Sequence, residues 1–349
     1  MAKNIILCLD GTGNQLKATG NTNVVRLFSF LKLDDPDQQI GYYDPGVGTF
    51  GAKGALLPIS HSFTRLIGLA FGYGVRENLA DAYTFLLRTF EPGDRIFIFG
   101  FSRGAFTGRA LAGMLNRAGL LRRGAENLVP YALRVYARSN ARWTKKDFHQ
   151  TGKFAKYFSI DVEGKRRIPI FFLGLWDSVK AAGLLRGDMT WPDTDQLPNA
   201  QYIRHAVSID EKRRAYREDL VEPKEGDPFP DWKEVWFAGV HSDVGGGFEK
   251  CRGLGDISLK WMIEQARDQG LLLNGTEREA LKAVRDASAS DTIHKMGWAW
   301  ALLTYRRRPV CPPDARVHAS VRTRMGAGIG YRPKLAQPRW EDPEWSRPI

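Results

Sequence analysis

The sequence has 349 residues, of which 43% are hydrophobic and 11% aromatic, so it can bury a full core and is too apolar to be disordered. Its three scattered cysteines exclude a disulfide framework and lack metal-ligand spacing, so we expect no structural metal. We expect no cofactor either. The charge of 51 basic against 39 acidic residues, a net +12, favours anionic partners and is concentrated in residues 119–167 and 301–349.

The N-terminal apolar run reads as a strand, because Asp10 ends it before it reaches the length of a secretory signal. No apolar run elsewhere approaches the roughly 18 residues that a transmembrane helix needs. We therefore expect cytoplasmic synthesis, without a signal peptide or a transmembrane helix.

Five apolar runs predict buried parallel strands, because they are continuous rather than alternating. They are Asn4–Leu9, Gln39–Tyr43, Arg95–Phe99, Ile168–Trp176 and Glu234–Val240. Helical patterns lie between several of these runs, at Val24–Leu31, Arg76–Thr89 and Arg103–Arg117. This alternation predicts an α/β fold with a doubly wound, mostly parallel sheet.

Two segments interrupt the alternation and are expected to be cap-like insertions. Residues 120–167 are basic and mostly helical in pattern, whereas residues 184–232 predict loops and a helix around His205–Arg217. We expect a catalytic domain of residues 1–270 that contains both insertions. Residues 271–349 would form a helical or irregular extension packed on this domain, with four possible anchors: Trp298, Trp300, Trp340 and Trp345.

Polar or glycine-rich residues follow all five predicted strands. In open α/β sheets, ligands bind beyond the carboxyl ends of the strands, so these segments predict one shared site. The segments are Asp10-Gly-Thr-Gly-Asn14, Asp44-Pro-Gly-Val-Gly-Thr49, Gly100-Phe-Ser-Arg-Gly104, Asp177-Ser-Val179 and His241-Ser-Asp-Val-Gly-Gly-Gly247.

The segment Gly100–Gly104 matches the pattern G-x-S-x-G between a predicted strand and a predicted helix. Such a turn needs glycines because its backbone is strained and crowded. It would present the Ser102 hydroxyl at the N-terminus of the helix, where a developing oxyanion is stabilised. We therefore predict that Ser102 is a nucleophile; the alternative is a simple helix N-cap.

A serine nucleophile needs a base, and in this fold the chain order is Ser, then Asp or Glu, then His. His241 fits best, because it follows a buried strand and precedes a glycine-rich loop. His205 and His318 are the alternatives. The predicted acid is Asp177, at the end of the fourth strand. Its competitor is Asp243, which could instead fix the loop or pair with Arg103.

The oxyanion hole is expected to use the N–H of the residue after the nucleophile, which is Arg103. A second N–H would come from Gly11 or Thr12, in the loop after the first strand. Asp10 is expected to support that loop through side-chain hydrogen bonds.

These motifs, as an ordered set, resemble the α/β-hydrolase family that includes type VI secretion phospholipase effectors of the first lipase class. The matching segments begin at Leu9, Tyr43, Gly100, Leu175, His205 and Val240. The resemblance implies an α/β-hydrolase-like fold and a Ser-Asp-His esterase acting on lipid esters. It carries Ser102, Asp177 and His241 over as the triad, and it implies non-classical, type VI export.

Three other interpretations are weaker. The segment Asp10–Thr12 is similar to a haloacid-dehalogenase phosphatase loop, but that chemistry needs an Asp at position 8, where this chain has Cys8. A metal site of Asp10, His241 and Asp243 lacks recognised spacing. A non-catalytic basic binding module would be expected to lack a triad member. We therefore predict a serine hydrolase of lipid or other esters, with peripheral contact to anionic membrane and no nucleic-acid partner.

Overall fold

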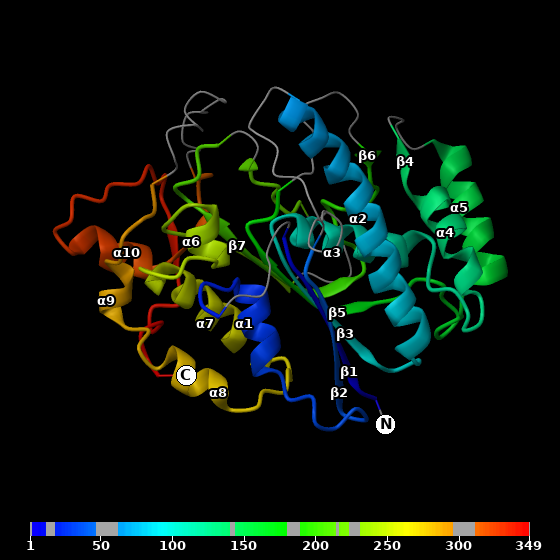
Figure 1. Ribbon diagram of the computed structural model, residues 1–349, viewed down its shortest axis with the longest axis horizontal. Coiled ribbons are helices and arrows are strands. Elements are labelled where there is room, and N and C mark those ends of the chain that lie inside the picture. Colours follow the sequence, from blue (N-terminus) through cyan, green and yellow to red (C-terminus); the bar gives the residue numbers. More distant parts are fainter. Residues whose placement is uncertain are drawn as a thin grey trace.

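The structure of the protein is a computed structural model, which describes residues 2–11, 18–46, 62–139, 144–179, 189–213, 216–222, 231–295 and 311–348. Its centre is an eight-stranded sheet in the order β10-β9-β8-β7-β5-β3-β1-β2, and each pair of neighbouring strands in it is parallel (Figure 1). The strands are β1 (Asn4–Leu9), β2 (Gln39–Asp44), β3 (Arg95–Phe101), β5 (Ile170–Trp176), β7 (Ala200–Ser208), β8 (Asp231–Phe237), β9 (Arg316–His318) and β10 (Arg339–Glu341).

The strand order reverses at β1, which has β2 on one side and β3 on the other. All later strands of the sheet follow on the β3 side, so the sheet is doubly wound and its switch point lies between β1 and β3. Ligands of such sheets bind at the carboxyl end of the switch point. The predicted α/β class is confirmed, and the parallel sheet with flanking helices is consistent with an α/β-hydrolase-like fold.

Helices cover both faces of the sheet (Figure 1). One face carries α2 (Ser62–Thr89), α3 (Arg103–Arg117), α4 (Val129–Tyr136) and α5 (Lys145–Phe158). The other carries α1 (Asn23–Phe30), α7 (Gly253–Arg267), α8 (Thr276–Leu281), α9 (Asp286–Ala289) and α10 (Ala319–Gly326). The run in β1 is continuous because alternate residues enter both cores: Ile5 and Leu7 face the first group of helices, and Ile6 and Cys8 face the second.

The helix predicted around His205–Arg217 is wrong, because residues Ala200–Ser208 form strand β7 in the middle of the sheet. Its polar side chains are buried with partners: Arg204 pairs with Asp231 at 2.9 Å, and His205 Nδ1 lies 2.9 Å from Glu234 Oε2. The last predicted strand, Glu234–Val240, is observed three residues earlier, as Asp231–Phe237. The helix predicted at Arg103–Arg117 is confirmed.

The segment predicted as the first insertion packs beside α3 and contains a short 3-10 helix, η1 (Glu126–Leu128), followed by α4 and α5. Its strand β4 (Arg138–Ser139) pairs with β6 (Met189–Thr190), which lies in the second predicted insertion, in a separate antiparallel ribbon. The C-terminal region adds β9 and β10 to the sheet beyond β8, and Trp345 is buried in it. Of the other anchors, Trp340 is half-buried, and Trp298 and Trp300 lie outside the described residues.

Across the parts of the chain that the structure describes, none of the helices is both long enough and apolar enough to span a bilayer.

Candidate active site

The turn between β3 and α3 holds Ser102 in a strained backbone conformation, with φ 59° and ψ −118°. A non-glycine residue in such a region costs on the order of 1–3 kcal/mol and is found mainly at functional sites. The turn fits against β1 only because residue 104 is glycine: a Cβ there would lie 2.0 Å from the carbonyl oxygen of Leu9. The Ser102 N–H donates to Trp176 O at 3.0 Å, which anchors the turn to β5.

Asp177 follows β5 directly and is almost fully buried. Its carboxylate accepts hydrogen bonds from both the backbone N–H and the hydroxyl of Ser208, at 2.8 and 2.9 Å. The same carboxylate lies 2.6 Å from His241 Nδ1. Asp177 is therefore held from the end of the neighbouring strand β7 and aimed at an imidazole.

His241 is the first residue of the short helix α6 (His241–Gly245), just after β8. Its Nε2 lies 2.8 Å from Ser102 Oγ, so the Ser102 hydroxyl, the imidazole and the Asp177 carboxylate form one continuous chain of hydrogen bonds. The rings of Phe101 and Tyr216 pack against the imidazole, with centroids 4.6 and 4.7 Å away. This geometry allows His241 to take a proton from Ser102.

Asp10 directly follows β1 and holds Gly11, the next residue. Its carboxylate accepts the N–H of Gly11 at 2.7 Å, the hydroxyl of Thr22 at 2.5 Å and that of Tyr43 at 3.1 Å. Burial and the Asp10 charge raise the pKa of Tyr43 above its ordinary value, so its hydroxyl keeps the proton that it donates. The other predicted oxyanion donor after β1, Thr12, lies outside the described residues.

Arg103 starts α3, and its side chain is buried. Burial lowers the pKa of its guanidinium to about 10, while nearby Tyr216 acts in the opposite direction. Its backbone N–H belongs to the first turn of α3, where helix N–H groups favour negative charge.

Asp243 contacts His294 rather than His241. Its Oδ1 lies 2.6 Å from His294 Nδ1, and its Oδ2 accepts the N–H of Val240 at 3.0 Å. The two alternative bases also have other partners. His205 accepts the Ser178 N–H at 3.1 Å, and His318 Nδ1 lies 2.8 Å from Ser320 Oγ.

The sequence interpretation missed the residues at the end of β7 that support the site. They are Ser208, which holds Asp177, and Asp210 and Glu211, which accept the backbone N–H groups of Gly239 and His241 at 2.8 and 3.2 Å. The one available signal was the segment His205–Glu211, which matched a family motif without suggesting a role for these side chains.

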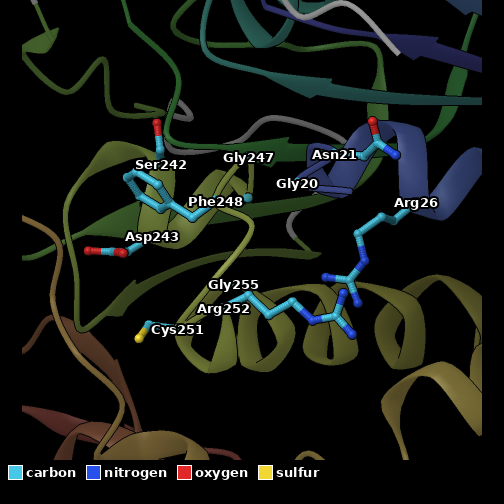
Figure 2. Close-up of a pocket in the computed structure, with 11 residues that line it drawn as sticks. Gly20, Asn21, Arg26, Ser242, Asp243, Gly247, Phe248, Cys251, Arg252 and Gly255 are labelled. Carbon is cyan, nitrogen blue, oxygen red and sulfur yellow. The ribbon is translucent and has the colours of Figure 1, made fainter. Parts of the chain in front are cut away.

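A small pocket lies behind α6, between α1 and α7, and Ser242 and Asp243 form part of its wall (Figure 2). Arg26 and Arg252 point toward each other across it. Both guanidinium groups pair with Asp256, at 2.5 and 3.7 Å. The lining includes neither Ser102 nor His241, so this pocket is separate from the hydrogen-bonded chain described above.

Within the described residues, no group of three or more His, Cys, Asp or Glu side chains is placed to hold a metal ion. The three residues of the alternative metal site each contact a different partner. Asp10 contacts Tyr43, His241 contacts Asp177, and Asp243 contacts His294.

Residues 3–265 match the family model described as "T6SS, Phospholipase effector Tle1-like, catalytic domain", where T6SS denotes the type VI secretion system. A curated relative, "Uncharacterized protein YEL023C" of Saccharomyces cerevisiae, is 38% identical over 226 residues, which cover 63% of this chain and 33% of the yeast protein. The chain thus spans about a third of the length of that relative.

Two solved structures are similar at lower identity. An uncharacterized protein from Pseudomonas aeruginosa is 21% identical with a TM-score of 0.45, and the match covers 78% of this chain and 46% of that one. A structure described as the Tle1 effector bound to the VgrG spike from the type 6 secretion system is 17% identical with a TM-score of 0.36, covering 72% and 52%.

Proposed function

Because the chain belongs to the family of Tle1-like type VI secretion phospholipase effector catalytic domains, we propose that it hydrolyses carboxylic ester bonds of phospholipids, with Ser102 as the nucleophile. The observation that carries this proposal is the pair of hydrogen bonds that joins Ser102 Oγ through His241 to Asp177, at 2.8 and 2.6 Å.

In the proposed reaction, His241 Nε2 takes the proton of Ser102 as its Oγ attacks the ester carbonyl. Asp177 holds the imidazole in the required tautomer and stabilises its charged form. His241 then gives the proton to the leaving alcohol, and an acyl-enzyme remains on Ser102. Water activated by His241 releases the fatty acid and restores the serine.

The first oxyanion donor in this proposal is the backbone N–H of Arg103, which directly follows the nucleophile at the start of α3. The loop after β1 would supply the second donor. The N–H of Gly11 donates to Asp10, so it would have to turn away from that carboxylate to bind substrate. Thr12 therefore stays an alternative in the proposal.

The wider arrangement is also proposed. Residues 1–270 would form the catalytic domain with insertions at 120–167 and 184–232, and residues 271–349 would pack on it and extend its sheet through β9 and β10. The family suggests export through a type VI system. Besides its lipid substrate, the protein would contact anionic membrane peripherally through α5, whose exposed lysines carry part of the basic excess.

The test of the proposed function is the substitution Ser102→Ala, with Ser29→Ala as its control, since Ser29 is an exposed serine of α1. Turnover is measured on a soluble p-nitrophenyl ester and as fatty acid release from phospholipid vesicles. We expect Ser102→Ala to lower kcat by about 10⁴-fold or more on both substrates, because the nucleophile is removed. Ser29→Ala should match the wild type. Equal turnover by wild type and Ser102→Ala would contradict the proposal.

A further inference from the structure

Three consecutive backbone amides after β8 are each held by a different buried carboxylate. The N–H of Gly239 donates to Asp210 at 2.8 Å, that of Val240 to Asp243 at 3.0 Å, and that of His241 to Glu211 at 3.2 Å. Each of the three acids is at most 5% exposed. Because these amides lead directly into His241, the three carboxylates fix the direction in which the histidine enters the site.

Each of these carboxylates is also bonded by a side chain, as a buried charge requires. Glu211 pairs with Arg213, two residues further along the chain, at 2.8 Å. The other two partners come from much later in the sequence. Tyr331 Oη donates to Asp210 Oδ2 at 2.8 Å, and His294 Nδ1 lies 2.6 Å from Asp243 Oδ1.

His294 is fixed in this position by two further contacts. Its ring stacks on Phe248, with centroids 3.5 Å apart and planes inclined by 9°. Its backbone N–H donates to Asp243 Oδ2 at 3.2 Å, so one residue bonds both oxygens of the carboxylate. Figure 2 shows Asp243 and Phe248 at the left of the pocket, away from the guanidinium groups of Arg26 and Arg252 at the right.

Arg324 of α10 connects the two late segments. Its guanidinium donates to the carbonyl oxygens of Ala289 and Asp291, at 2.7 and 2.6 Å, and lies 4.9 Å from the ring of Tyr331. Arg324 therefore links the segment that bears His294 to the segment that bears Tyr331.

We propose that His294 and Tyr331 are positioning residues for His241, acting through Asp243 and Asp210. Both lie outside residues 3–265, the part of the chain that the family model matches. The inference rests on the proposed function in taking His241 as the base. It adds that the base is held in place by the C-terminal region.

The test uses the full chain with His294→Ala and Tyr331→Phe, which remove the two partners. His294→Asn retains a donor near the position of Nδ1. Tyr202→Phe removes a phenol hydroxyl from β7 at a ring that packs on Phe171, and serves as the matched control. Two quantities are measured: kcat and KM on a soluble p-nitrophenyl ester, and hydrogen exchange of the amides in peptides covering residues 237–244.

We expect His294→Ala to lower kcat roughly 10-fold and Tyr331→Phe roughly 3-fold, with KM changed less than about 2-fold, because a displaced base slows the chemical step. Both variants should exchange the amides of residues 239–241 faster than the wild type does. His294→Asn should recover most of the kcat that His294→Ala loses, and Tyr202→Phe should change neither quantity.

Unchanged exchange at residues 239–241 in a folded Tyr331→Phe or His294→Ala protein would overturn the inference. If His294→Ala does not fold, Tyr331→Phe and His294→Asn decide it. Failure of the proposed function is recognised separately, as turnover that Ser102→Ala does not remove. The exchange measurement still decides the positioning role in that case.

Discussion

At the scale of single residues, the two aspartates near His241 have different tasks. Asp177 bonds the imidazole itself, whereas Asp243 bonds the backbone N–H of Val240 and the side chain of His294. Burial raises the pKa of Asp243 above its ordinary value, although the hydrogen bonds from Val240 and His294 act in the opposite direction. On the proposed mechanism, the first aspartate acts on the proton transfer, and the second acts on the position of the backbone that leads into His241.

Substituting these two aspartates by asparagine should separate the tasks. Asp177→Asn keeps the shape but favours the wrong histidine tautomer, so we expect a loss in kcat of about 10⁴-fold. For Asp243→Asn we expect kcat to fall by only on the order of 10-fold, since the amide oxygen still accepts the Val240 N–H. Both values are measured with a soluble ester. A kcat for Asp177→Asn within a few-fold of the wild type would show that another group orients His241.

The site residues that follow strands could be predicted from the sequence. Those that contact the site from distant segments of the chain could not. Ser102, Asp177 and His241 each stand at a strand end, where a local pattern identifies them. His294 and Tyr331 belong to segments with weak periodicity, and they contact acids 51 and 121 residues away. No local pattern encodes contacts at such separations.

At the scale of elements, the close fit of α3 against β1 depends on Gly104. An added Cβ would lie 2.0 Å from Leu9 O, which is backbone and cannot move without displacing β1. We expect Gly104→Ala to lower the free energy of unfolding by roughly 3 kcal/mol or more, since overpacking of this kind distorts the backbone. Urea unfolding measures the loss of stability, and kcat on a soluble ester measures whether the displaced backbone also lowers activity.

Gly152→Ala in α5 is the matched control, because a Cβ there has nothing within 4 Å. Alanine favours a helix interior over glycine, so this variant should gain roughly 0.5–1 kcal/mol in stability. A Gly104→Ala protein as stable and as active as the wild type would mean that the strand and helix pack less closely than described.

Strand β7 shows why the central part of the sheet was predicted incompletely. Its sequence includes Arg204 and His205, which break the continuous apolar pattern expected of a buried strand. Their burial is possible because Arg204 pairs with Asp231, and His205 with Glu234, both on the adjacent strand β8. Periodicity reads one strand at a time, so it does not detect polar residues that are satisfied across a strand pair.

At the scale of the whole molecule, the outer surface of α5 is strongly basic. Lys145, Lys146, Lys153 and Lys156 are exposed, whereas the only acid of the helix, Asp147, is buried and bonds the N–H of Thr144. Phe148 and Tyr157 are 39% and 60% exposed beside these lysines. Lysines with exposed aromatic rings are typical of helices that bind an anionic membrane surface.

Replacing these four lysines by glutamine should weaken binding to vesicles that contain phosphatidylglycerol by at least about 10-fold, since each lysine contributes on the order of 1 kcal/mol near such a surface. Binding is measured by co-sedimentation at low and high salt. Turnover of a soluble ester should not change. The control replaces Lys32, Lys250, Lys282 and Lys295, which are also exposed. Equal vesicle binding by the two variants would exclude α5 as the membrane contact.

The bond between Tyr331 and Asp210 has a consequence for the protein during its own synthesis. A ribosome releases Ser102, Asp177 and His241 long before Tyr331. The nascent chain can thus contain the three proposed catalytic residues before the bond between Tyr331 and Asp210 has formed. On the proposed positioning role, full hydrolytic activity would arise only after residue 331 has been synthesised and Tyr331 has bonded Asp210.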